Sequence, residues 1–159
     1  MINNDYSPSL VSAIKLAQSM ARQERQSTYG VPHLVLAMLT ESTGLKEILQ
    51  SMQKDVAYLM DWFDTRKEMY TSSESDSDEI CADDELSKVL DEAERSKIKL
   101  GSDHIDALCV FTAISREGVI YSHQQIELLG VSEEDILKYY DALTPAYSFQ
   151  GEENQILAS

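Results

Sequence analysis

Residues that could perform chemistry are few and scattered in this chain of 159 residues. The three histidines, His33, His104 and His123, have no ligand-like spacing to Cys81 or Cys109, so no zinc site is expected. A serine or cysteine nucleophile needs a base and an orienting third group, and the sequence offers no such arrangement. His33 begins an apolar segment and Cys109 lies within another, so both are predicted to be packing residues that make local hydrogen bonds at most.

The acidic clusters do not indicate catalysis either. Residues 133–135 fall in the first turn of an expected helix, where negative charge favours the helix dipole. The stretch 71–84 lacks the glycine and the terminal glutamate of an EF-hand loop. No Gly-x-x-x-x-Gly-Lys-Ser/Thr occurs, so the chain has no phosphate-binding loop. We predict no catalytic, cofactor-binding or metal-binding residues, and therefore no enzyme activity of the chain by itself; a small hydrolase is disfavoured.

Charge and hydropathy exclude several partners. Acidic residues outnumber basic ones 28 to 13, giving a net charge of −15 that disfavours nucleic acid and anionic membranes. No apolar run approaches the ~20 residues of a membrane span, and the first residues do not resemble a signal peptide. Two cysteines make a disulfide framework implausible, so a cytoplasmic location is expected.

Apolar periodicity predicts four helices in the first half. The first covers 9–22, with Leu10 and Ile14 on its apolar stripe. Pro32 opens a second helix that is apolar nearly all round, as a central bundle helix is. A short third helix begins near Leu45, and Asp55 caps a fourth.

The same pattern then recurs. A shift of 76 residues places Leu10 on Leu86 and Ile14 on Leu90 without a gap, and the shift becomes 77 after Gly118. The sequences of any two amphipathic helices can be aligned by chance if the register is free. A gap-free register of this length favours duplication. We predict an all-α fold of two packed four-helix units, about eight helices in a single domain 1–143. Repeat one covers about 9–67, repeat two about 85–143, with a flexible acidic linker at 71–84 and a tail or linker at 144–159.

With the repeat established, the chain resembles the N-terminal domain of Clp/Hsp100 AAA+ ATPases. The residues that carry the resemblance are 17–21, followed after eleven residues by 33–39, and in the second half Val89, Leu90, Ala93, Gly101, Ile105 and 109–114. Cys109 stands where the family often has histidine. The resemblance implies a module that captures substrate or adaptor segments for an unfoldase or disaggregase, the ATP and Mg²⁺ belonging to an ATPase module C-terminal to this chain. Any hexamer would form only through that module.

Two branches of this interpretation stay open. One is that the chain resembles the ClpV ATPases of type VI secretion, in which the corresponding domain binds a helix of a sheath protein. The alternative is a freestanding adaptor or regulator that carries the repeat without an ATPase in the same chain. A Walker A motif within ~100 residues after Ser159 would favour the unfoldase.

A helical module without chemistry most readily binds an amphipathic protein segment in a groove between helices. The expected groove walls are the first helices of the two repeats, with a possible rim from the second repeat. The candidate residues are Tyr6, Leu10, Val11, Ile14, Leu86 and Val89, with Tyr121 and Gln125 at the rim. Plain core packing is the favoured interpretation for Ile14, Leu86 and Val89, whereas partial exposure is expected for Tyr6, Val11 and Tyr121.

Overall fold

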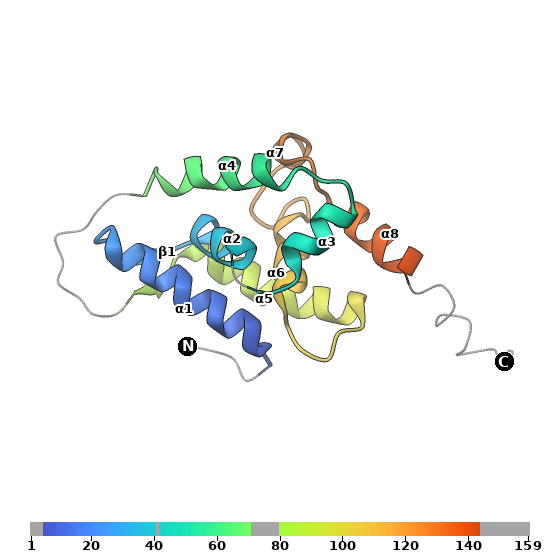
Figure 1. Cartoon of the computed structure of the whole chain (residues 1–159), viewed down its shortest axis with the longest axis horizontal. Coiled ribbons are helices and arrows are strands. Elements are labelled where there is room, and N and C mark those ends of the chain that lie inside the picture. Colours follow the sequence, from blue (N-terminus) through green and yellow to red (C-terminus); the bar gives the residue numbers. More distant parts are fainter. Residues whose placement is uncertain (1–4, 41, 71–79, 144–159) are drawn as a thin grey trace, which may run out of the picture.

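The computed structural model describes residues 5–40, 42–70 and 80–143. Within these ranges the chain forms eight helices and two very short strands, as Figure 1 shows. The elements are α1 (Pro8–Gln23), β1 (Thr28–Tyr29), α2 (Val31–Thr40), α3 (Leu45–Ser51), α4 (Val56–Lys67), β2 (Cys81–Ala82), α5 (Asp84–Leu100), α6 (Ala107–Ile114), α7 (His123–Leu129) and α8 (Glu133–Leu143). The predicted all-α architecture is confirmed.

The two halves share their local signals as well as their helix order. Ser7 caps α1 by accepting the Leu10 N–H, and 76 residues later Asp83 caps α5 by accepting the Leu86 N–H. A left-handed residue follows each helix, Arg25 in the first half and Gly101 in the second, with φ values of 59° and 69°. These pairs obey the shift of 76 found in the sequence. The predicted duplication is therefore visible in the backbone.

The core is built around α2 and α6, the second helix of each repeat. All residues of α6 are buried, and so are nine consecutive residues of α2 from Val31 to Leu39. The other helices bury one face each and surround this pair, so α2 lies amid α1, α4 and α5 (Figure 1). A helix that is apolar on all sides can be stable in water only when neighbours cover it all round.

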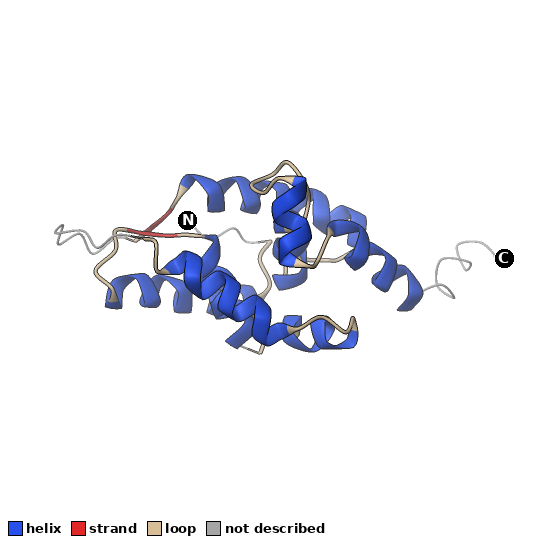
Figure 2. Cartoon of the chain, turned by 90° about the horizontal axis from the view of Figure 1, so that it is seen from above, coloured by secondary structure: helices blue, strands red, loops and turns tan. Residues whose placement is uncertain are grey.

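Two short parallel contacts join the repeats, and they correct one prediction. β1 pairs with β2, placing Thr28 opposite Cys81 and Tyr29 opposite Ala82, while Tyr6 forms an isolated parallel bridge with Ile105. Figure 2 shows the strand pair toward one end of the molecule. The predicted linker 71–84 is thus wrong for its last part, because residues 81–84 form β2, the Asp83 cap and the start of α5. Its first part, 71–79, and the predicted tail 144–159 lie outside the described residues.

Candidate functional site

Four predicted groove residues are core residues instead. Leu10, Ile14, Leu86 and Val89 have at most 2% of their surface exposed, so they cannot contact a partner in the folded domain. The faces of α1 and α5 that carry them pack inward, α1 mainly on α2 and α5 mainly on α6. The core packing favoured for Ile14, Leu86 and Val89 is thus confirmed, and Leu10 is corrected from a groove residue to a core residue. Val11 is partly exposed, as expected.

A groove between the first helices of the two repeats nevertheless exists, lined by other residues. We call it the repeat groove; its volume is about 530 Å³. α1 contributes one wall, α5 the other, and the strand pair and Tyr6 contribute the remaining lining. The lining residues are Tyr6, Gln18, Arg22, Tyr29, Ile80, Cys81, Ala82, Ser87, Leu90 and Asp91. Of the eight candidate residues, only Tyr6 lines this groove.

The repeat groove combines apolar and polar side chains. Ile80 and Leu90 are partly buried and pack against the core, so each leaves apolar surface facing the groove. Burial raises the pKa of the Tyr6 and Tyr29 phenols, which keeps both neutral hydrogen-bonding groups. Arg22 and Asp91 are exposed and carry opposite charges on the α1 and α5 walls. Such a lining suits an amphipathic segment better than a small charged metabolite.

Tyr121 and Gln125, the predicted rim residues, line a second pocket, of about 510 Å³, which shares no residue with the repeat groove. Arg66 of α4 also lines this pocket, and its guanidinium carbon lies 3.5 Å from the centroid of the Trp62 ring and 5.8 Å from that of Tyr121. Only 7% of Tyr121 is exposed, less than predicted, because the Trp62 ring packs edge-on against it. Burial raises the pKa of Tyr121 to about 12, although Arg66 opposes that shift.

A buried polar network lies between the two repeats and uses His33. The Gly30 N–H donates to Nδ1 of His33 at 3.0 Å, so the ring proton is on Nε2, which donates to Oε1 of Gln26 at 2.8 Å. Gln26 in turn donates to the Tyr70 carbonyl, and the Tyr70 hydroxyl donates to Asp83. Burial lowers the pKa of His33 to about 4, so the ring is neutral. The predicted packing of His33, with local hydrogen bonds from its ring nitrogens, is confirmed.

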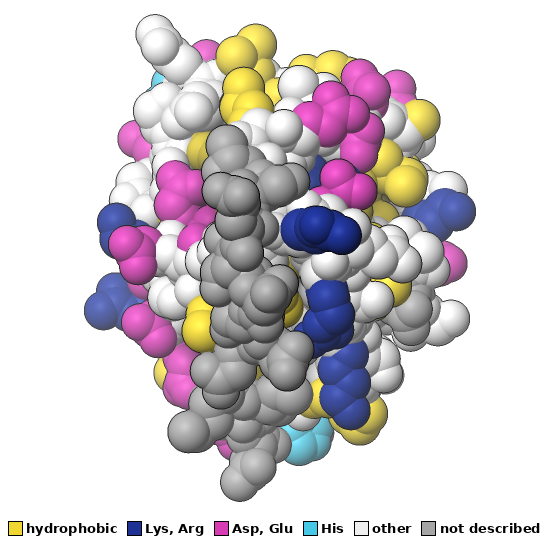
Figure 3. All heavy atoms as spheres, turned by 90° about the vertical axis from the view of Figure 1, so that its left-hand side faces the viewer, with side chains coloured by type: hydrophobic (Ala, Val, Ile, Leu, Met, Phe, Trp, Pro, Cys, Tyr) yellow, Lys and Arg dark blue, Asp and Glu magenta, His cyan; other side chains and the backbone are white. Residues whose placement is uncertain are grey.

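Other kinds of site are not evident in the described parts of the chain. No group of three or more His, Cys, Asp or Glu side chains gathers there in a way that could hold a metal ion. None of the described helices is long and apolar enough to cross a membrane. On the face at the left of Figure 1, Lys and Arg side chains form a row beside a wider scatter of Asp and Glu (Figure 3).

The two repeated four-helix units, α1–α4 and α5–α8, and the groove between α1 and α5 define a class of small helical binding domain. The family model of the Clp repeat (R) N-terminal domain matches residues 5–125, which is most of the chain. The chain belongs to this family. A search of curated proteins finds no match.

Solved structures of N-terminal domains share the fold. The Hsp104 N-terminal domain from Candida albicans superposes with a TM-score of 0.67 at 17% identity, covering 88% of this chain and 91% of that one. The N-domain of ClpV from Vibrio cholerae gives 0.70 at 14% identity, covering 87% and 84%. A complex of a ClpV N-domain with a VipB peptide gives 0.68 at 16% identity, covering 86% and 85%. At these identities the likeness concerns the fold alone.

Proposed function

We propose that this domain captures short protein segments in the repeat groove and delivers them to a Clp/Hsp100-type AAA+ unfoldase. The domain performs no catalysis and needs no cofactor of its own; ATP and Mg²⁺ belong to the ATPase module that it serves. Family membership supports this function, since Clp N-terminal domains are substrate-binding modules. The VipB peptide bound to one ClpV N-domain supports a peptide as the ligand.

The observation that carries the proposal is the composition of the repeat groove. Its apolar surface at Ile80 and Leu90 can cover the apolar face of a helix or strand, while Gln18, Arg22 and Asp91 offer hydrogen bonds and charge to the polar edges. A groove of this size and mixed lining favours modest affinity, on the order of 1–100 μM. Such affinity suffices when several copies act together around a ring.

Filling the groove tests the proposal. Ser87 is exposed on the α5 wall, so Ser87→Trp should occupy the groove without disturbing the core. The matched control is Ser12→Trp, which places the same ring on an exposed position of α1 outside the groove. Fluorescence anisotropy with a labelled VipB peptide, and with a panel of synthetic amphipathic helices, measures affinity for both variants.

We expect Ser87→Trp to weaken peptide binding at least about tenfold, and Ser12→Trp to bind as the wild type does. Binding by the helix panel without VipB would place the domain outside the ClpV branch while supporting capture. Equal binding by the two variants would overturn the assignment of the groove. Absence of saturable binding by every peptide would overturn the function itself.

A further inference from the structure

A second apolar surface lies away from the repeat groove, where α4 passes α7. It is made by Tyr58, Trp62, Arg66 and Met69 from α4 and the turn after it, and by Tyr121 and Leu128 from α7 and the turn before it; we call it the α4–α7 seam. Figure 1 shows the two helices close together at the top of the molecule. The Tyr58 hydroxyl donates to the Leu128 carbonyl at 2.7 Å, and Trp62 stacks edge-on against Tyr121. These two contacts join α4 to α7 and to the turn before α7.

The seam contains most of the exposed large hydrophobic residues of the described part of the chain. Four large hydrophobic side chains are exposed among the described residues. Three of them belong to the seam: Tyr58, Met69 and Leu128. Leu128 is 63% and Met69 72% exposed. Their concentration around α4 and α7 is typical of a protein contact surface.

The fold does not require this surface. The shift of 77 that relates the last helices of the two repeats takes Ser51 to Leu128 and Tyr58 to Asp135. Ser51 is exposed and polar, and Asp135 forms an ion pair with Lys54 and hydrogen bonds with Ser132. Equivalent positions in the other repeat thus fold well with polar side chains. The apolar seam is a property of this one face and not of the repeat.

Arg66 gives the seam a charge preference. Its guanidinium is half-buried against the Trp62 ring, and within the described ranges no ion pair involves it. One of its donors is used by the Tyr121 hydroxyl. The remaining edge donors of a stacked guanidinium can bind a carboxylate in a fixed geometry. Glu85 lines the same pocket from α5, and its negative charge disfavours a ligand with more than one carboxylate there.

We propose that the α4–α7 seam binds a helical protein segment that carries two apolar side chains about three turns apart with a carboxylate between them. The apolar side chains lie on Tyr58 and Leu128 at one end and on Met69 at the other, and the carboxylate meets Arg66. The distance from position 58 to position 69 along a helix, about 16 Å, matches about three helical turns. This proposal rests on the proposed function only in taking a protein segment as ligand; it concerns a different face of the domain.

The probe is a synthetic helix of about 16 residues with two leucines about three turns apart and one glutamate between them, labelled with fluorescein. Fluorescence anisotropy measures its affinity for wild type, Leu128→Lys and Ile98→Lys. Ile98 is the matched control, because it is the fourth exposed hydrophobic residue and lies on α5 outside the seam. We expect Leu128→Lys to weaken binding at least about tenfold and Ile98→Lys to leave it unchanged.

A charge swap and a groove variant complete the test. Arg66→Glu should weaken binding of the glutamate peptide and favour the same peptide with lysine in place of glutamate. Ser87→Trp, which blocks the repeat groove, should leave the affinity for the seam peptide unchanged. If the peptide fails to bind wild type, or if Ile98→Lys weakens binding as much as Leu128→Lys, the seam proposal is wrong. If Ser87→Trp alone abolishes binding, the peptide occupies the repeat groove; the seam proposal is then wrong while the proposed function stands.

Discussion

Tyr6 forms a parallel bridge with Ile105, and a shift of 76 residues turns this pair into Ala82 and Tyr29, which also pair in parallel. The hydrogen bonds follow the same rule: the Ser7 N–H donates to the Ile105 carbonyl at 2.9 Å, and the Asp83 N–H to the Tyr29 carbonyl at 3.0 Å. In each repeat, the residues before the first helix thus pair with the backbone of the other repeat. This is the reciprocal contact that a two-fold symmetric pair would make.

The N-cap residues of α1 and α5 are equivalent in the two repeats, but Asp83 also accepts a hydrogen bond from the Tyr70 hydroxyl. Ser7→Ala and Asp83→Ala each remove an N-cap acceptor and should cost about 1 kcal/mol of unfolding free energy. Asp83→Ala should cost roughly 1–2 kcal/mol more, because it also removes the acceptor of the Tyr70 hydroxyl. Urea unfolding followed by circular dichroism measures both. In a Tyr70→Phe background the two costs should become similar; a persistent difference would contradict the assignment.

Gly30 should be intolerant of a side chain because of close packing. A Cβ at this position would lie 2.6 Å from Oδ2 of Asp83 and even closer to the Tyr70 hydroxyl. We expect Gly30→Ala to destabilise the domain by about 1–3 kcal/mol, and Tyr70→Phe to recover part of that loss. Thermal unfolding of the two single variants and the double variant checks this. Fully additive losses would show that Tyr70 is not the obstacle.

His33 should make stability depend on pH in a defined window. Its pKa is about 4 in the folded domain, against about 6.5 in an unfolded chain. Between these values the unfolded chain binds a proton that the folded domain does not, so stability falls as the pH drops from 6.5 to 4. The contribution is fully present above that window and amounts to about 3 kcal/mol. Urea unfolding at several pH values should show this loss in wild type and not in His33→Gln; the same loss in both would contradict it.

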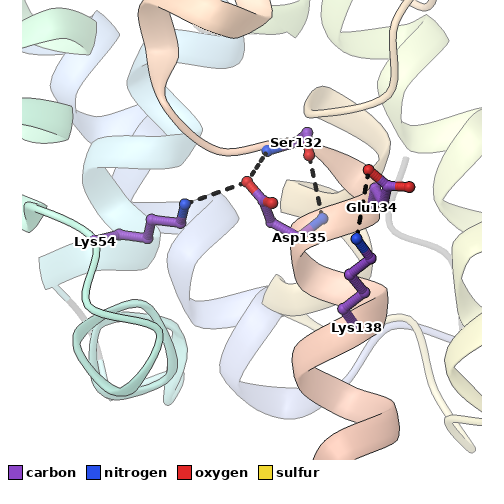
Figure 4. Close-up of polar contacts among 5 residues, drawn as sticks. All are labelled: Lys54, Ser132, Glu134, Asp135 and Lys138. Atoms are coloured by element: carbon purple, nitrogen blue, oxygen red, sulfur yellow. Dashed lines mark hydrogen bonds and ion pairs between the residues drawn. The ribbon is translucent and has the colours of Figure 1, made fainter.

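The start of α8 is held by a cap and an ion pair, drawn in Figure 4. Asp135 accepts the Ser132 N–H and Lys54 lies 3.2 Å from its carboxylate, whereas Lys138 reaches Glu134 only at 3.9 Å. Burial alone would raise the pKa of Asp135, but these donors outweigh it and lower the pKa. Lys54→Met should therefore raise the pKa of Asp135, as measured by NMR titration, and cost less than about 1 kcal/mol.

Lys138→Met is the control for that titration, because Lys138 contacts Glu134 and not Asp135. It should leave the Asp135 titration unchanged. An equal effect of the two substitutions would mean that general charge, and not the Lys54 contact, sets the pKa.

Much of the fold followed from periodicity in the sequence. The apolar stripes predicted the helices, and the gap-free register predicted the duplication. Both predictions worked because the helices of the two halves bury equivalent positions against α2 and α6. The pairing of β2 was not predicted, since Cys81 and Ala82 follow an acidic stretch and are stabilised by β1, more than fifty residues earlier. Pairing between distant segments leaves no local pattern to find.

The repeat groove lies between the two helices named in the prediction, but on faces other than those that carry most of the predicted residues. Leu10 and Leu86 lie on the apolar stripes, and a stripe marks the buried face, so the groove lies on the polar flank near Gln18 and Ser87. The cluster of Arg66, Trp62 and Tyr121 joins residues more than fifty positions apart and was missed. The recurrence of Tyr58, Trp62, Arg66 and Met69 at spacings of four, four and three was a signal in the sequence.

The two cysteines provide an internal comparison for a direct test of the repeat groove. Cys81 is exposed and lines the groove, while Cys109 is buried and burial raises the pKa of its thiol to about 11. A thiol reagent should therefore modify Cys81 rapidly and Cys109 only on unfolding.

The labelling rate of Cys81 in the presence of a bound peptide tests the central claim most directly. With a saturating VipB peptide, or the best binder of the helix panel, we expect Cys81 to react several-fold more slowly in wild type, and no such protection in Ser87→Trp. An unchanged labelling rate at saturation would place the peptide elsewhere and contradict capture in the repeat groove.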